Sequence, residues 1–211
     1  MNAPSDVRSP VKRVKRAKSE ALPLGAFLQE QRESGVLEEA TLDALVVSTE
    51  ATLPASLKER LLSSLDREHR FQSFEERVAE LSDLPESVAS VLLGRLDSKE
   101  HWAPVGAPGV EIFHFDGGPK VRDAITGFVR ILPGSSFPVH EHMGHETVLV
   151  LQGTLRDDDG EEYSAGDEIE MDADSTHSFS AAGDVPLVLV TVVMKGVTID
   201  GQFIPPGDPR A

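Results

Sequence analysis

The chain is 211 residues long, contains no cysteine and carries a formal net charge of −16 at pH 7. This length allows one large domain or two small ones with a real core. The lack of cysteine excludes disulfides and thiolate metal ligands and suits a reducing cytoplasm, where we expect the protein to act. No apolar run is long enough to span a bilayer, so no membrane association is expected.

Residues 1–20 are basic, with six lysine or arginine residues against two acidic ones. They contain too few apolar residues to fold alone, so we predict a disordered tail. The tail lacks interleaved aromatic residues and a helix-turn-helix pattern, and the rest of the chain is acidic, so direct nucleic-acid binding is not expected. The apolar run "ALPLGAFL" that follows has no small-residue cleavage site after it, which argues against a secretory signal.

Residues 21–97 show the spacing of four or five short amphipathic helices. The pattern is clearest in "SLKERLLSSL", where Ser56 and Glu59 have the spacing of a capping box and leucines recur at helical intervals. Ser73 and Glu76 repeat that spacing in "SFEERVAEL". Each predicted helix is apolar on one stripe only and must bury that stripe against its neighbours or against a partner. This segment is therefore a candidate partner-binding domain.

From Trp102 onward, short apolar stretches alternate with turns, and no helical pattern separates them. Asp159 and Gly160 form a hairpin signal, and "LVLVTVVM" is typical of a strand buried on both faces. At least seven strands in about a hundred residues predict an antiparallel sandwich or closed barrel over residues 98–198. The chain is thus predicted to be α+β, with short helices before the barrel and a C-terminal tail at residues 199–211.

Histidine and glutamate gather in "GSSFPVHEHMGHETVLVLQG", residues 134–153. Because side chains alternate between the faces of a strand, His140 and His142 point to the same face. Glu146 begins the next apolar stretch in phase with two valines, so it joins the histidines if that face lines a barrel interior. Burying these groups without partners would be costly, and a divalent cation is the simplest partner. His177 is available as a fourth ligand from a neighbouring strand.

The other histidines fit this site less well. His145 is out of phase with Glu146, so we expect it at the rim of the site. His69, His101 and His114 are isolated in the sequence and are interpreted as structural. Histidine and carboxylate ligands accept most first-row divalent ions. We expect one ion per chain, with zinc as the first choice and iron, manganese or nickel as alternatives.

The spacing of the cluster resembles the first sequence motif of the cupins. Gly134, five residues, His140-x-His142, three residues, Glu146, six residues and Gly153 reproduce that motif completely. The resemblance implies a small antiparallel jelly-roll barrel with a metal site of three histidines and one glutamate.

The second cupin motif is only partial. Gly166 and His177 have the right separation, but Asp172, Asp174 and Ala181 occupy the usual proline, glycine and asparagine positions. These departures fall at turn positions rather than at the ligand. The resemblance therefore still implies that His177 is a ligand, while the shape of the preceding turn is left open.

A closer resemblance is to the ChrR family of anti-sigma factors. The stretches "WAPVGAPGVEIFHFDGG", "GFVRILPGSSFPVHEHMGHETVLVLQG" and "DDDGEEYSAGDEIEM" are similar to the C-terminal cupin of that family. "LPASLKERLLSSL" is similar to the segment that joins its N-terminal helical domain to the cupin. The resemblance implies an N-terminal domain that clamps an extracytoplasmic-function (ECF) sigma factor and holds its own zinc through histidine and a Cys-x-x-Cys pair. It also implies a cupin that tunes the response to oxidative signals such as singlet oxygen.

This chain departs from the family at the N-terminal zinc site, because it has no cysteine and no histidine before His69. Residues 1–68 therefore cannot hold that zinc. Either the predicted helices bind a sigma factor by apolar burial alone, or the clamp has decayed. The leading interpretation is a metal-binding cupin protein that regulates transcription as an anti-sigma factor for an ECF sigma factor in an oxidative-stress-type response. Since cupins often dimerise, a homodimer is a further candidate assembly.

The alternative is a metal-dependent cupin dioxygenase acting on a small diketone or a hydroxylated aromatic. Three histidines and one glutamate leave two open positions on an octahedral ion, enough for a bidentate substrate or dioxygen. An inward side chain such as Arg130 would orient an anionic substrate. A third interpretation is a binding module whose ion only stabilises the barrel. The upstream helices favour the regulator, whereas the missing Cys-x-x-Cys pair weakens it.

Overall fold

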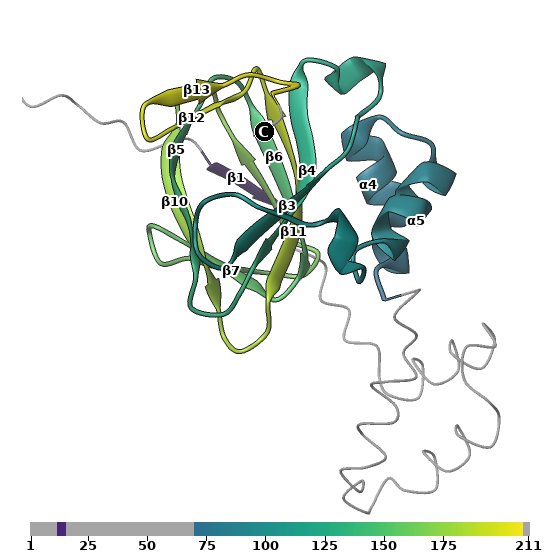
Figure 1. Cartoon of the computed structure of the whole chain (residues 1–211), viewed down its shortest axis with the longest axis horizontal. Helices are drawn as coiled ribbons and strands as arrows, with labels where there is room; N and C mark the ends of the chain where they lie inside the picture. The colour runs from purple at the N-terminus through teal and green to yellow at the C-terminus, as the bar shows by residue number, and fades with distance from the viewer. Residues whose placement is uncertain (1–11, 16–69, 209–211) are drawn as a thin grey trace, which may run out of the picture. The chain divides into compact units, whose positions relative to one another are not determined.

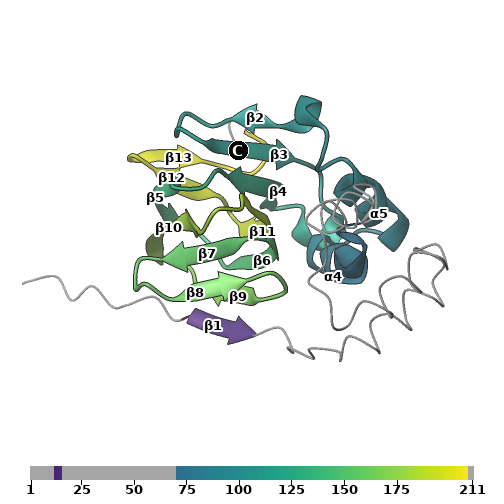
Figure 2. The same ribbon diagram turned by 90° about the horizontal axis from the view of Figure 1, so that it is seen from below.

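The computed structural model describes residues 12–15 and 70–208 of the chain. The strands are β1 (Lys12–Lys15), β2 (Ala103–Pro104), β3 (Val110–His114), β4 (Ala124–Ile131), β5 (Ser136–His142), β6 (Glu146–Gln152), β7 (Thr154–Asp157), β8 (Glu162–Ser164), β9 (Glu168–Met171), β10 (Thr176–Ala182), β11 (Leu187–Met194), β12 (Val197–Ile199) and β13 (Gln202–Ile204). They form a seven-stranded sheet of order β1-β9-β6-β11-β4-β3-β2 and a six-stranded sheet of order β13-β12-β5-β10-β7-β8 (Figures 1 and 2). Neighbouring strands are antiparallel throughout, as predicted.

The core of the barrel lies between the two sheets, because both contribute side chains to it. The buried cluster there includes Val150, Ile169 and Leu189 from the seven-stranded sheet and Tyr163 and Phe179 from the six-stranded sheet. Strand β11, "LVLVTVVM", is central to its sheet, where it pairs with β4 on one side and β6 on the other. It is buried at most positions of both faces, as its continuous apolar run predicted.

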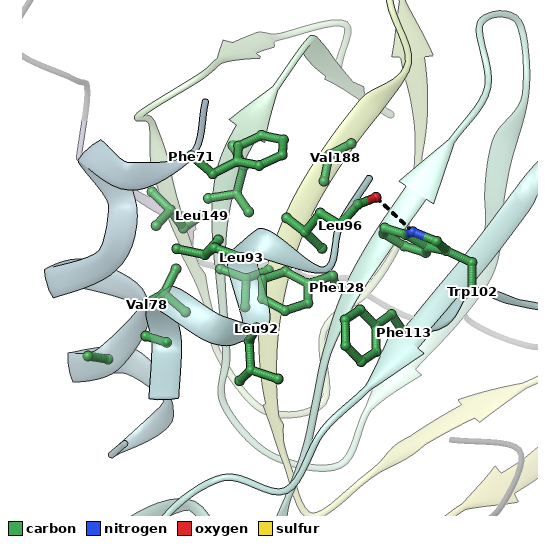
Figure 3. Packing of buried hydrophobic residues seen from close by; sticks show 14 residues of the cluster. Phe71, Val78, Leu92, Leu93, Leu96, Trp102, Phe113, Phe128, Leu149 and Val188 are labelled. Atoms are coloured by element: carbon green, nitrogen blue, oxygen red, sulfur yellow. Dashed lines mark hydrogen bonds between the residues drawn. The ribbon is translucent and has the colours of Figure 1, made fainter. Parts of the chain in front are cut away.

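Two helices, α4 (Glu75–Ser82) and α5 (Glu86–Gly94), cover the outer face of the seven-stranded sheet (Figure 3). Val78 of α4 and Leu93 of α5 are buried in one cluster with Leu149 of β6. The apolar stripe of each helix is therefore satisfied by the barrel, which gives the sheet an apolar covering on both of its faces.

The helices and the barrel form one unit, which differs from the predicted division into a helical segment at residues 21–97 and a barrel from residue 98. The indole N–H of Trp102 donates to the Leu96 carbonyl oxygen at 3.0 Å and fixes the connection between α5 and the sheet (Figure 3). The compact unit that holds the barrel accordingly includes both helices and consists of Met1–Ala17 and Glu68–Ala211. The remainder of the predicted helical segment, including Ser56, Glu59 and His69, lies outside the described residues.

The ends of the helices differ in part from the prediction. Helix α4 has no capping box, because Phe74 is its N-cap and no side chain caps it. Helix α5 begins after Pro85, which suits this position because a proline N–H is not needed in the first turn. No helix in the described part of the chain is long and apolar enough to cross a membrane.

Short strands also form in both segments that the sequence assigned to tails. Strand β1 pairs with β9 at one edge of the seven-stranded sheet, within the predicted disordered tail of residues 1–20. Strand β13 pairs with β12 within the predicted tail of residues 199–211. Asp200 and Gly201 form the turn between them, with φ of 50° and 73°. Strands of three or four residues are too short to show a recognisable alternation in sequence.

Candidate metal centre

Strands β5 and β6 direct three of the four predicted ligands into the barrel. On β5, His140 and His142 are buried. Val139, which precedes them, and Glu141, which lies between them, are exposed, as alternation requires. Glu146 is the first residue of β6 and is buried in the interior. The sequence interpretation of a common inward face is therefore correct for these residues.

Strand β10 supplies the fourth predicted ligand from the same sheet as β5. His177 is the second residue of β10 and stands directly opposite His140 in the antiparallel register. The donor atoms of His140, His142, Glu146 and His177 all lie within 4.8 Å of one another. Three strands from two sheets thus bring together residues that are up to 37 positions apart in the chain.

The donor atoms face one another at short range. Nε2 of His142 is 3.0 Å from Oε2 of Glu146, and Nε2 of His177 is 3.0 Å from Nε2 of His140. Nε2 of His177 is also 3.6 Å from Oε2 of Glu146. Nε2 of His142 and Oε2 of Glu146 are buried without a hydrogen-bond partner. Because unpartnered buried nitrogen and carboxylate atoms are costly, this arrangement fits a divalent cation held by all four residues.

Hydrogen bonds on the far side of two rings set their tautomers. Nδ1 of His140 is 2.9 Å from the carbonyl oxygen of Pro138, which only accepts, so Nδ1 carries the proton. Nδ1 of His142 is 2.9 Å from the hydroxyl of Ser175, whose own proton goes to the carbonyl oxygen of Asp172. In both rings Nε2 therefore carries a lone pair that is directed into the cluster, as a metal ligand requires.

The protonation states of the cluster also suit a cation. Burial, together with the neighbouring His177, lowers the pKa of His140 to about 4, so the ring is neutral at pH 7. Burial acts to raise the pKa of Glu146, but His142 and His177 outweigh it and hold the pKa well below its ordinary value. A neutral imidazole and an ionised carboxylate are the forms that bind metal, so these two groups need lose no proton when an ion enters at neutral pH.

Two residues that support the site were not identified from the sequence. Ser175 orients His142, and the hydroxyl of Thr191 on β11 donates to Oε1 of Glu146 at 2.7 Å. Thr191 did carry a signal, because it is the only hydroxyl in the apolar run "LVLVTVVM". A lone polar residue in a strand buried on both faces needs a buried partner, and here that partner is Glu146.

The turn before His177 is hydrogen-bonded and contains a residue with positive φ, although the motif is substituted. Asp174 stands where the cupin pattern has glycine, and it adopts the left-handed conformation that glycine favours, with φ of 63°. Aspartate tolerates this conformation better than most residues. The amide of Asp174 donates to the His142 carbonyl oxygen at 2.8 Å, and the amide of His142 donates to the Ser175 carbonyl oxygen at 2.9 Å. The turn is thus hydrogen-bonded to the strand that bears two of the ligands.

Gly144, between β5 and β6, is needed for close approach of two backbones. A Cβ at this position would lie 2.5 Å from the carbonyl oxygen of Met194, which real structures do not allow. The connection between His142 and Glu146 therefore requires a glycine, because the backbone of strand β11 lies against it.

The remaining candidates lie outside the cluster. The side chain of His145 is 42 % exposed, with Nδ1 3.9 Å from a carboxylate oxygen of Asp172, which places it at the periphery as predicted. The ring of His101 stacks on Phe113. Arg130 does not point inward, contrary to expectation, because its guanidinium binds Glu111 and lies over the ring of Trp102.

A small apolar cavity adjoins the cluster. Its volume is about 60 Å³, and His140 and Glu146 form part of its wall. His114 and Thr191 are the other polar side chains that line it, and the remaining side chains are apolar: Ile112, Ile125, Val129, Phe137, Phe179, Leu189, Val193, Val197, Ile199 and Ile204. No lysine or arginine among the described residues lines this space. The cavity is small beside the roughly 300–1,000 Å³ of typical ligand pockets.

A search of curated proteins gives no significant match. Among solved structures, an acetylacetone dioxygenase from Acinetobacter johnsonii matches with a TM-score of 0.45 and 15 % identity, covering 53 % of this chain and 83 % of the other. An RmlC-like cupin protein from Ralstonia eutropha JMP134 matches with a TM-score of 0.43 and 22 % identity, covering 49 % and 70 %.

The family model of the ChrR Cupin-like domain matches residues 95–194. This range runs from the end of α5 through strand β11 and contains all four residues of the cluster.

Proposed function

Residues 95–194 are a ChrR Cupin-like domain, and on that premise we propose that the protein is a metal-binding transcription regulator that holds an ECF sigma factor. The barrel would carry the metal centre, and the N-terminal segment would carry the partner-binding surface. The protein would then act in the cytoplasm, where sigma factors meet RNA polymerase. The signal proposed from the family resemblance is an oxidative one.

The position of strand β6 is the observation that supports this proposal. Its inner face contributes a side chain to the metal cluster, and its outer face packs against the helices. Glu146 points into the cluster from the inner face. Leu149 and Leu151 on the outer face belong to the buried cluster that anchors α4 and α5. A displacement of β6 when an ion binds or leaves would therefore act on helices that directly follow the N-terminal segment in the chain, since close-packed interiors transmit strain.

Zinc is the ion we propose for the site, with iron, manganese and nickel as alternatives. His140, His142, Glu146 and His177 would hold it, and a bound zinc supplies the positive charge that offsets the buried carboxylate. The chain itself fixes the donors: Ser175 sets the ring of His142, and β5, β6 and β10 hold the four side chains in place. In a regulator these residues need only hold or release the ion.

The test is capture of a sigma factor by the full chain. Zinc-loaded and chelator-stripped protein are each mixed with the ECF sigma factor encoded nearby, and the dissociation constant is measured. We expect binding, with an affinity that differs about 5–150-fold between the two forms, as allosteric coupling of about 1–3 kcal/mol gives. Absence of binding in both forms contradicts the proposal. Equal binding of the two forms would mean that the ion stabilises the barrel but does not regulate sigma-factor binding.

A matched pair of variants isolates the role of the metal cluster. Glu146→Gln removes the carboxylate charge from the cluster, whereas Glu141→Gln makes the same change at an exposed position of β5. Only Glu146→Gln should shift sigma-factor affinity toward that of the stripped form. Sedimentation of the same preparations tests the homodimer, which stays a prediction.

A dioxygenase is the second candidate, and the cavity beside His140 and Glu146 is the observation that favours it. The dioxygenase ranks behind the regulator for two reasons. The cavity is too small for a bulky substrate, and Arg130 points outward, so it cannot bind an anionic substrate there. Oxygen consumption by iron-loaded protein with a small diketone or a hydroxylated aromatic tests this function. Turnover that disappears in Glu146→Gln but persists in Glu141→Gln would reverse the order of the two candidates.

A further inference from the structure

The acidic edge of the seven-stranded sheet is covered by a basic strand from the start of the chain. Strand β9, "EIEM", carries two glutamates, and strand β1, "KRVK", carries three cationic residues. The two strands pair over all four residues, from Lys12 opposite Met171 to Lys15 opposite Glu168 (Figure 2). Opposite charges on paired strands favour the pairing, so the edge selects a basic segment.

Glu168 binds both β1 and α4. Its side chain is only 6 % exposed, and one of its oxygens accepts a hydrogen bond from Nζ of Lys15 at 2.9 Å. The guanidinium of Arg77 in α4 donates to both carboxylate oxygens, with Nε at 2.7 Å and Nη2 at 2.6 Å. Strand β1 and helix α4 stand on either side of residues 16–69 in the sequence. One buried carboxylate therefore binds a described element on each side of that segment in the sequence.

Strand β9 also lies next to the metal-bearing strand. Met171 is opposite Glu146 of β6 on one side and opposite Lys12 of β1 on the other. Met171 and Ile169 line a narrow internal space together with His177. Strand β9 is thus the one strand between β6 and β1, and its inward side chains lie beside a ligand of the cluster.

The pairing of β1 is small enough to be reversible. It spans four residues at a sheet edge, Val14 is its one apolar side chain, and the side chain of Lys15 is 63 % exposed. Elements with few buried contacts open at a free-energy cost well below that of global unfolding. The ion pairs of Lys15 are partly screened by salt, which lowers their contribution further.

We propose that β1 is a detachable clasp, which pairs with β9 while the cluster holds its ion and leaves β9 when the ion is lost. Release would separate β1 from Glu168, while Arg77 keeps α4 bound to the same carboxylate. This inference rests on the proposed function in one respect: β1 and α4 flank in the sequence the segment that is proposed to contact the sigma factor. The occupant of β9 is the chain's own Lys12–Lys15.

Amide hydrogen exchange of the full chain, read by mass spectrometry, tests the clasp without any partner. Zinc-loaded protein should protect residues 12–15, and zinc-stripped protein should exchange them at least about tenfold faster while β11 stays protected. Equal exchange of residues 12–15 in the two forms would overturn the proposal, and so would a lack of protection in the zinc-loaded form.

A charge variant keeps the test decisive if stripping the ion unfolds the barrel. Glu168→Gln should speed exchange of residues 12–15 at least about tenfold with zinc still bound, because Lys15 loses its buried partner. Glu141→Gln is the matched control, since it neutralises an exposed carboxylate on β5, a strand that pairs with neither β1 nor β9. Metal analysis confirms that both variants keep their ion. If Glu168→Gln protects residues 12–15 as well as wild type does, the clasp is not held as proposed.

A pair of cysteines identifies the occupant of the edge. The chain has no cysteine, so Arg13→Cys with Glu170→Cys offers a single disulfide between register partners. Antiparallel partners lie within disulfide range. Oxidised glutathione should cross-link the zinc-loaded protein as a monomer, at least about tenfold faster than the stripped protein. Covalent dimers on a non-reducing gel would assign β9 to a second copy and overturn the proposal.

The same double-cysteine variant tests the clasp and the proposed function separately. When it is oxidised, the clasp cannot open, and the sigma factor should bind at least about tenfold more weakly than it does to the reduced form. Equal binding of the two forms removes the link between the clasp and the partner. If the sigma factor binds neither form, the proposed function fails, whereas the exchange and cross-linking results still decide whether the clasp exists.

Discussion

His142 and Glu146 are each fixed by a hydroxyl that lies outside the cluster. The hydroxyl of Ser175 accepts a hydrogen bond from Nδ1–H of His142, and Thr191 donates to the oxygen of Glu146 that does not face His142. The free ends of both side chains are then directed at the same point. Metal affinity in this barrel should therefore depend on residues that never touch the ion.

Ser175→Ala should lower metal affinity about 10–100-fold, because the His142 ring loses the acceptor that holds its orientation and tautomer. Competition with a chromogenic chelator measures the change. Ser178→Ala is the control, since that hydroxyl bonds to the exposed carboxylate of Asp158 instead. A Ser175→Ala protein with wild-type affinity would mean that packing alone orients the ring.

His142→Ala should abolish stoichiometric metal binding, because it removes a donor from a site with four. His145→Ala should keep about one ion per chain, since that ring lies outside the donor set. Metal analysis of both purified proteins decides the matter. Retention of a full equivalent of metal by His142→Ala, or its loss from His145→Ala, would contradict the ligand assignment.

At the level of elements, Glu168 joins β9 to α4 and β1 through charge. Burial acts to raise the pKa of Glu168, but the hydrogen bonds from Arg77 and Lys15 outweigh it and leave the pKa below its ordinary value. A carboxyl whose pKa is lower in the folded state binds protons more readily when unfolded. Its contribution to stability is therefore complete above the ordinary value of 4.5 and is lost as pH falls toward the folded value.

Glu168→Gln should lower the free energy of unfolding by about 1–3 kcal/mol at pH 7, between the values for exposed and fully buried ion pairs. The difference from wild type should shrink as pH falls below about 4.5, because wild-type Glu168 then becomes neutral as well. Urea unfolding at several pH values measures both effects. A difference that is constant from pH 7 to pH 3 would show that charge is not its cause.

For the whole molecule, the packing of α4 and α5 on the sheet predicts which fragments of the chain fold, because the barrel needs both helices. A fragment of residues 68–211 should unfold cooperatively and hold metal, whereas a fragment of residues 98–211 should aggregate or bind a hydrophobic dye. The shorter fragment loses buried side chains such as Val78 and Leu93, each contributing about 1.5–3 kcal/mol, and exposes the sheet beneath them. Such losses approach the roughly 5–15 kcal/mol stability of a typical domain. Cooperative unfolding of the shorter fragment would restore the predicted boundary.

Parts of this architecture could be read from sequence because short-range rules determine them. Alternation along one strand placed His140 and His142 on a common face, and phase with apolar neighbours added Glu146. Arg130 could not be placed, because β4 is buried on both faces and its hydrophobicity does not distinguish inside from outside. Likewise, the apolar stripe of α5 indicated that something covers it but not that the barrel does so.

Strand β1 has a consequence for how the molecule avoids self-association. Without it, β9 would present unpaired amides and carbonyls at a sheet edge, the usual starting point of aggregation. The opposite edge is already protected, because β2 has only two residues and one is Pro104. On β9 the protection comes from charge: pairing with the β9 of another copy would crowd Glu168 and Glu170 of both chains onto one short ribbon, and like charges on paired strands repel. The uncovered edge of β9 therefore disfavours pairing with β9 of a second copy, whereas it still favours pairing with the basic strand β1.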